Sequence, residues 1–180
     1  DLLDTDGGVV KIAAAHNIRK LHVFGAAILI FAENGVWSIS GVDNVFRATE
    51  FSISKISDVG LVNENSFVVA GSSPIWWSKT GIYTIQTSET SGQPEARNIS
   101  LASIQTLWNK IPNEKKAQVF VEYDEVNQKV FWCYPDAEED IDYKYNNVLI
   151  LDVNLQAFYP WKVSDGTAGH YIIGSSYFSG

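Results

Sequence analysis

The sequence predicts an all-β fold of repeated antiparallel β-meanders with propeller-like spacing, and one short helix near residues 101–111. Three observations predict it. A pattern of apolar runs and glycines returns after 46 residues. Aromatic residues make up 13% of the chain, and aromatic side chains pack well on the half-buried surface of a strand. Gly, Asn and Asp stand between short apolar runs, as they do in tight turns. A β-sandwich is the alternative architecture, but it does not explain a fixed offset.

The repeat relates two parts of the chain without a gap. The aligned stretches, all offset by 46 residues, are 21–25 with 67–71, 35–39 with 81–85, and 53–54 with 99–100. Each copy is typical of three short strands followed by a longer return segment. Repeats of about 40–50 residues made of short antiparallel strands have the spacing of propeller blades. The sequence therefore favours blades over the two layers of a sandwich.

Glycines mark the bends of both copies. Asn34-Gly35 is a strong hairpin signal, because the type I′ turn needs positive φ at both central residues. Gly81 occupies the equivalent turn in the second copy. Gly25 and Gly71 fall at the other bends, where glycine turns without a steric penalty. We therefore expect tight hairpins at these four positions.

A third, looser unit follows the two copies. Its expected strands are residues 119–123, 129–132, 147–151 and 155–159, with a further candidate at 171–173. Turns are expected at residues 124–128 and at Asn154. The three repeat units would span approximately residues 21–66, 67–112 and 113–161 of one β-rich segment.

One helix is predicted between the second and third units. Apolar residues recur at three-to-four spacing from Leu101 to Ile111, Ser100 is a candidate N-cap, and Pro112 would end the helix. Three to four units are few for a closed propeller, and the chain has no Met. The sequence therefore predicts a fragment of a longer chain.

The net charge of −8 disfavours a protein that grips nucleic acid, because an acidic surface repels phosphates. It is compatible with a wall along which DNA slides. Cys133 is the only cysteine and lies in an apolar run, so we interpret it as a small buried residue and not as a nucleophile.

Motifs for catalysis, cofactors or metals are not recognisable in the chain. The P-loop, GxGxxG, HExxH and GxSxG patterns are missing, and the nearest approach to the last is residues 174–176. His16, His22 and His170 have no partner at metal-ligand spacing. The acidic residues between Asp136 and Asp142 lack the Gly and Glu that an EF-hand loop needs. Residues 4–8 are interpreted as a turn. We therefore expect no enzyme activity, no cofactor and no metal site; a glycosidase with paired carboxylates is the least favoured alternative.

Trp76-Trp77 is the one pair that we select as a candidate interface. Adjacent residues of a strand point to opposite faces, so one ring would enter the core and the other would meet a neighbouring sheet, another subunit or a ligand. Packing between blades is the first interpretation. An interface anchor and a platform for sugar stacking are the alternatives. Asn98-Ile99-Ser100 also matches a glycosylation sequon, a pattern that arises often by chance.

Several stretches together resemble the tail tubular, or nozzle, proteins of short-tailed bacteriophages. They are residues 28–41, 46–49, 81–83, 98–100, 104–112, 123–124 and 127–130, and the resemblance covers roughly residues 21 to 160. It implies a virion structural protein with a β-propeller, located in the phage tail. Copies of the chain would form a ring around the channel for genome ejection, with the adaptor and fibres of the tail as partners. DNA would pass without specific binding, and no small-molecule substrate is implied.

The alternative function is a propeller or sandwich module that recognises carbohydrate or protein, for which Trp76 and Trp77 would be the aromatic contacts.

Overall fold

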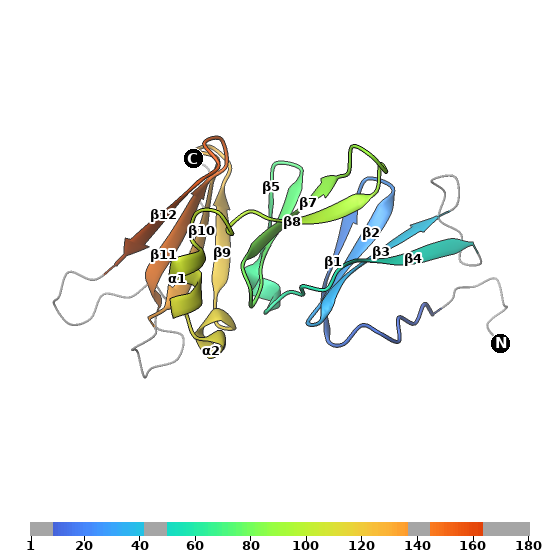
Figure 1. Ribbon diagram of the computed structural model, residues 1–180, viewed down its shortest axis with the longest axis horizontal. Coiled ribbons are helices and arrows are strands. Elements are labelled where there is room, and N and C mark those ends of the chain that lie inside the picture. Colours follow the sequence, from blue (N-terminus) through green and yellow to red (C-terminus); the bar gives the residue numbers. More distant parts are fainter. Residues whose placement is uncertain (1–8, 42–49, 137–144, 164–180) are drawn as a thin grey trace. The chain divides into compact units, whose positions relative to one another are not determined.

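The computed structural model describes residues 9–41, 50–136 and 145–163, and the fold is all-β as predicted (Figure 1). The chain divides into two compact units, residues 1–61 and residues 62–180. The first unit contains one four-stranded antiparallel sheet, and the second contains two.

In every sheet the strands follow one another in chain order, so each sheet is a simple meander. Sheet 1 consists of β1 (Ile18–Phe24), β2 (Ala27–Ala32), β3 (Gly35–Gly41) and β4 (Phe51–Ser57). Sheet 2 consists of β5 (Phe67–Ala70), β6 (Ser73–Trp77), β7 (Ile82–Thr87) and β8 (Pro94–Asn98). Sheet 3 consists of β9 (Phe120–Asp124), β10 (Lys129–Pro135), β11 (Tyr145–Asp152) and β12 (Ala157–Lys162). The helical segments are η1 (Glu64–Ser66), α1 (Gln105–Lys110) and α2 (Asn113–Lys116).

The 46-residue repeat is visible in the strand registers of sheets 1 and 2. Leu21 pairs with Ile30 in sheet 1, and Phe67 pairs with Trp76 in sheet 2, each partner being shifted by 46. The next pair along, Ile30 with Trp37, recurs in the same way as Trp76 with Tyr83. From residues 21 and 67 onward, the first three strands of both sheets therefore pair in the same register, whereas residues 18–20 of β1 correspond to η1 in the second copy.

The return segment of each copy contains a fourth strand that the sequence did not predict, and here the offset fails. In sheet 1, Ile53 lies opposite Ile39 on the neighbouring strand. In sheet 2, Ile99 follows the end of β8, and its N–H donates to the carbonyl of Ile82, the residue that corresponds to Val36. The alignment of Ile53 with Ile99 was therefore wrong as a structural equivalence.

The hairpin between β2 and β3 differs in detail from its prediction. Glu33 and Asn34 are its two turn residues, and Asn34 does not have positive φ. Gly35 pairs with Ala32 and has φ of +155°, and Gly81 has φ of +158° in the second copy. A Cβ on Gly35 would lie 2.6 Å from the carbonyl oxygen of Ser57, so this glycine is required both by conformation and by space.

The predicted helix is shorter than expected and starts later. Ile104 is the N-cap of α1 instead of Ser100. The Ser100 hydroxyl accepts a hydrogen bond from the N–H of Ile82 and donates to Oδ1 of Asn98, so it serves sheet 2 and cannot cap a helix. Pro112 does follow the end of α1, and it is also the N-cap of α2. The predicted strand at 171–173 lies outside the described residues.

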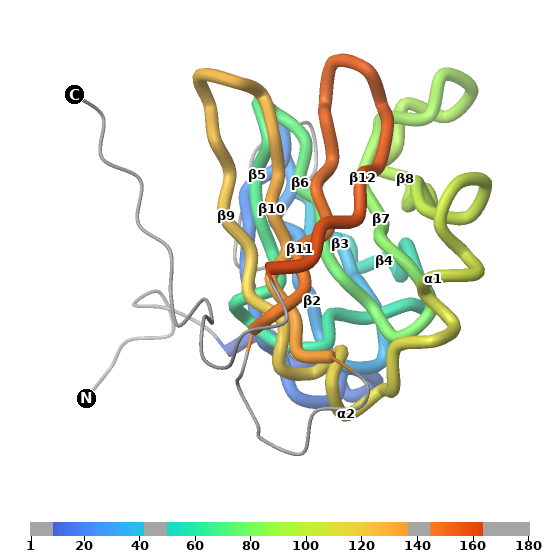
Figure 2. Tube along the Cα trace, turned by 90° about the vertical axis from the view of Figure 1, so that its left-hand side faces the viewer, coloured from blue at the N-terminus to red at the C-terminus, as the bar shows by residue number. Residues whose placement is uncertain are grey.

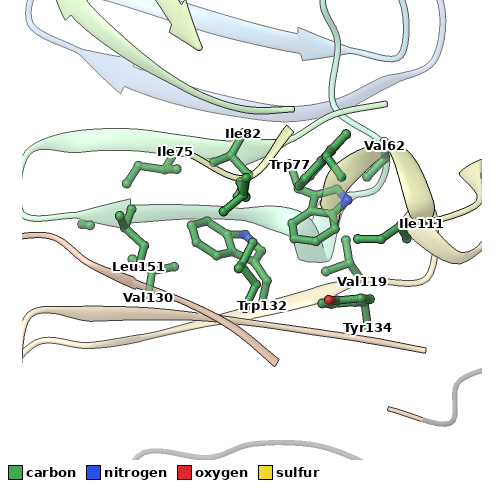
Figure 3. Close-up of a cluster of buried hydrophobic side chains, with 14 residues drawn as sticks. Val62, Ile75, Trp77, Ile82, Ile111, Val119, Val130, Trp132, Tyr134 and Leu151 are labelled. Carbon is green, nitrogen blue, oxygen red and sulfur yellow. The ribbon is translucent and has the colours of Figure 1, made fainter. Parts of the chain in front are cut away.

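Both sheets of the second unit contribute to its main core (Figure 3). We call the face of sheet 2 that carries Trp76 its first face and the face that carries Trp77 its second face. Trp77 and Ile82 on the second face pack against Val130 and Trp132 of sheet 3. The first strands β5 and β9 also lie side by side (Figures 1 and 2).

Candidate interaction surfaces

Trp76 and Trp77 point to opposite faces of β6, as alternation in a strand requires, and both side chains are fully buried. Trp76 stacks on Tyr83 of the neighbouring strand, with ring centroids 5.6 Å apart. Trp77 lies between sheets 2 and 3, which is the first interpretation that the sequence favoured for the pair. A role of Trp76 as an interface anchor stays a prediction.

Trp77 is the centre of an aromatic cluster that joins sheets 2 and 3 (Figure 3). Its ring centroid is 4.2 Å from that of Trp108 on α1, 5.5 Å from Tyr134 and 6.2 Å from Trp132. The separations from Tyr134 and Trp132 lie within the 4.5–7 Å range of favourable aromatic pairs, and the separation from Trp108 lies just below it. The indole nitrogens of Trp77 and Trp132 have no hydrogen-bond partner among the described residues, so the rings contribute through packing.

Polar contacts join the segments that precede β5 and β9, and they also join α2 to the turn that follows β6. Nδ2 of Asn63 donates to the carbonyls of Ala117 and Val119, both at 2.8 Å. Nζ of Lys116 donates to the carbonyl of Lys79 at 3.1 Å. Burial lowers the pKa of Lys116, and its charge is compensated in part by the ring of Trp108, 5.3 Å away. The first strands of the two sheets are thus tied together at one end.

Sheets 2 and 3 face the same way, so that unlike faces meet in the core. The second face of sheet 2 packs against the face of sheet 3 that is equivalent to the first face of sheet 2, and we call this face of sheet 3 its first face. Ile82 and Asn146 both belong to the third strand of their sheet, and both carbonyls accept a hydrogen bond from the fourth-strand side, from Ile99 and Val163. L-residues that point their carbonyls to the same side of equivalent strands have their side chains on the same face. Ile82 is on the second face of sheet 2, so the second face of sheet 3 is the one with Asn146, opposite the core with Trp132.

The second face of sheet 3 is mostly apolar and becomes more exposed toward its edge strand β12. Its two cross-strand rows are Phe120–Cys133–Val148–Trp161 and Glu122–Phe131–Ile150–Tyr159. Cys133 and Val148 are buried, but Trp161 is 57% and Tyr159 is 47% exposed. An exposed Trp next to an exposed Tyr on one strand face is the kind of surface found at binding hot spots.

Cys133 lies on the second face of sheet 3, and its thiol has low reactivity. Burial, and to a smaller extent the charge of Glu122, raises the pKa of its thiol to about 12. A thiol of such pKa contains almost no thiolate at neutral pH, so it is a poor nucleophile. The sequence interpretation of Cys133 as a buried apolar residue agrees with its position.

The first face of sheet 1 is a second surface with exposed apolar side chains. It corresponds to the Trp76 face of sheet 2 through the 46-residue offset. Leu21 is 60% and Val23 is 68% exposed on its edge strand β1, and Ile53 is exposed on the opposite edge. Val10, Ile12 and Ala15 cover another part of this face, where they pack against the cluster of Ile30, Ala32, Trp37 and Ile39.

The residues considered for metal binding do not gather. Within residues 9–41, 50–136 and 145–163, no three His, Cys, Asp or Glu side chains lie together as a metal site would require. Asp136 forms an ion pair with Lys162 at 2.5 Å. Burial and the charge of Lys20 lower the pKa of His22, on β1. The remaining predicted acidic loop, His170 and residues 4–8 and 174–176 lie outside the described residues.

The side-chain oxygen of Asn98, the asparagine of the sequon, is engaged in hydrogen bonds with the two residues Ser100 and Leu101. Oδ1 of Asn98 accepts hydrogen bonds from the N–H groups of Ser100 and Leu101 and from the Ser100 hydroxyl, which is itself buried. The arrangement is a local turn that closes sheet 2 below Gly81.

Comparison with known proteins finds no matching family model and no matching curated protein. Within the described part of the chain, the helices are all too short or too polar to cross a bilayer.

Proposed function

We propose that the chain is a virion structural protein, a subunit of the nozzle ring in the tail of a short-tailed bacteriophage. The observation that carries the proposal is the repeated four-stranded meander, in which the first three strands of sheets 1 and 2 share one register at an offset of 46 residues. Repetition of such sheets around an axis is how propellers are built. The resemblance of residues 21 to 160 to nozzle proteins supports the same conclusion.

The stacking of sheets 2 and 3 supports a propeller-like arrangement in particular. Sheet 3 receives the second face of sheet 2 on its first face, and the two first strands β5 and β9 lie closest to each other. In a propeller the first strands of successive blades line the central channel. An extension of this stacking is the arrangement we propose for the assembled protein.

The charge of the chain suits the proposed conduit. A net charge of −8 repels the phosphates of a passing DNA duplex, so the genome would move through the ring without being held. The partners in this function are copies of the chain, the adaptor and fibres of the tail, and DNA that is not bound specifically.

A density-gradient sedimentation of the native source tests this function, with each fraction probed by an antibody against the chain. Comigration with DNA-filled particles is the expected result. Recovery of the chain only in the light soluble fractions would contradict a virion role, whatever its state of association.

A carbohydrate- or protein-recognition module is the second candidate, favoured by the exposed Tyr159 and Trp161 on one strand. Trp76 and Trp77 are buried and do not offer a platform for a sugar. A glycan array with the wild-type chain and a Trp161→Ala variant tests this function. Selective binding that the substitution abolishes, with an unchanged circular dichroism spectrum, would favour it over the ring subunit.

A further inference from the structure

The large apolar side chains that are exposed on strands divide unevenly among the three sheets. Ile18, Leu21, Val23 and Ile53 are exposed on sheet 1, and Tyr159 and Trp161 on sheet 3. Sheet 2, whose strands are all described, exposes none. The exposed apolar surface of the strands therefore belongs to the first and last sheets of the chain.

The two exposed surfaces are of unlike type. On sheet 3, Tyr159 and Trp161 belong to the second face. On sheet 1, Leu21 and Val23 belong to the first face, since they correspond to Phe67 and Val69 of sheet 2. The chain thus presents one second face and one first face to solvent, each only partly covered.

A second face against a first face is the contact that sheets 2 and 3 already make. Trp77 and Ile82 on the second face of sheet 2 pack into the first face of sheet 3 beside Val130 and Trp132. The first face of sheet 1 corresponds in register to the first face of sheet 2, and it is therefore of the same type as the first face of sheet 3, which receives a neighbouring sheet in the core of the second unit. The exposed second face of sheet 3 and the exposed first face of sheet 1 are therefore the same two types of face that pack against each other between sheets 2 and 3.

We propose that copies of this chain associate head to tail, with the second face of sheet 3 in one copy packed on the first face of sheet 1 in the next. This rests on the proposed function as a ring subunit and names the surfaces through which the copies meet. A contact between unlike surfaces is heterologous, and such contacts produce closed rings or open filaments instead of isolated two-fold dimers. We call the exposed first face of sheet 1 the head surface, with Leu21 as its anchor. We call the exposed second face of sheet 3 the tail surface, with Trp161 as its anchor.

The test uses two charge-introducing variants of the full chain. The head-blocked variant carries Leu21→Lys and Val23→Lys, and the tail-blocked variant carries Tyr159→Lys and Trp161→Lys. Lysines on an exposed edge strand are how natural sheets avoid association. All four positions are substantially exposed, so the fold should tolerate the substitutions. Circular dichroism verifies that it does.

Sedimentation velocity over a range of concentrations measures the result. The wild type should form oligomers larger than a dimer, and each variant alone should be a monomer, with association weakened about 30-fold or more. An equimolar mixture of the two variants should form a dimer and nothing larger, because the mixture supplies one intact head and one intact tail per pair. The matched control carries Val126→Lys and Leu155→Lys, two exposed apolar residues in turns, and should associate like the wild type.

Three outcomes would overturn the inference. They are a wild type that stays monomeric, a head-blocked variant that dimerises by itself through its tail surface, and oligomers that neither variant weakens. The last outcome contradicts the assigned surfaces while leaving a ring subunit possible through others. The gradient experiment decides the virion role separately, because it depends on the location of the chain and not on how copies touch.

Discussion

Replacement of Trp77 by alanine is the sharpest test of the core between sheets 2 and 3. The side chain is fully buried and lies against Trp108, Trp132 and Tyr134. Truncation of a buried Trp to Ala costs about 3–5 kcal/mol, since the transfer free energy is lost and a cavity remains. This range already includes the loss of aromatic contacts, because it comes from measured substitutions of buried Phe and Trp by Ala. We therefore expect the free energy of unfolding of residues 62–180 to fall by about 3–5 kcal/mol.

Two further variants make the test specific. Trp161→Ala removes the same atoms from a position that is 57% exposed, and it should change the free energy of unfolding by less than about 1 kcal/mol. Trp77→Phe keeps an aromatic ring and loses no hydrogen bond from the indole nitrogen, so its effect should fall between the two. Urea unfolding of the full chain, followed by circular dichroism and tryptophan fluorescence, measures all three. Equal effects of Trp77→Ala and Trp161→Ala would refute an inter-sheet core centred on Trp77.

Three other predictions follow from single contacts. Gly71→Ala should destabilise the chain by about 1–2 kcal/mol through its positive φ alone. Gly81→Ala should destabilise it by more, because a Cβ there would also lie 2.7 Å from the Ser100 hydroxyl oxygen, and thermal melts compare the two variants. Asn63→Ala should cost about 1–3 kcal/mol in urea unfolding, since it leaves the carbonyl of Val119 without its side-chain donor, and an unchanged midpoint would contradict this. The raised pKa of Cys133 favours the protonated thiol in the folded state, so its contribution to stability is intact below the unfolded-state pKa near 9 and declines as pH rises from 9 toward about 12. A thiol reagent at pH 8 should label Cys133 only after unfolding. Fast labelling of the native chain would argue against burial of the thiol.

The sequence predicted ten of the twelve described strands and missed the fourth strands of sheets 1 and 2, and burial explains the difference. The unpredicted strands β4 and β8 pair on one side only, and most of their residues are exposed or half-buried. Their side chains are free to be polar, so residues such as Pro94–Asn98 contain no apolar run to recognise. The valid anchors of the 46-residue offset lie in the first three strands and the turns between them, where apolar runs and glycines recur.

The candidate surfaces were less accessible to sequence reasoning than the core. Trp76-Trp77 attracted attention as adjacent aromatic residues, yet both are buried. Tyr159 ended the predicted strand 155–159, and Trp161 lay beyond it, past Pro160, a residue that is rare inside strands. Proline is tolerated there since β12 is an edge strand that pairs only with β11. A sequence signal did exist, in the apolar run from Ala157 to Trp161, but it does not alternate.

Burial on both faces of a strand argues against the two layers of a β-sandwich. A sandwich sheet keeps one face in solvent, so its strands alternate apolar with polar residues. In β6, Trp76 and Trp77 point to opposite faces and neither is exposed. In β10, Trp132 and Cys133 do the same. A chain whose central strands are apolar on both sides needs a neighbour for each face of each sheet, and successive stacking of sheets supplies it, as sheets 2 and 3 do. The same argument makes the partly exposed second face of sheet 3 the position at which another sheet is to be expected.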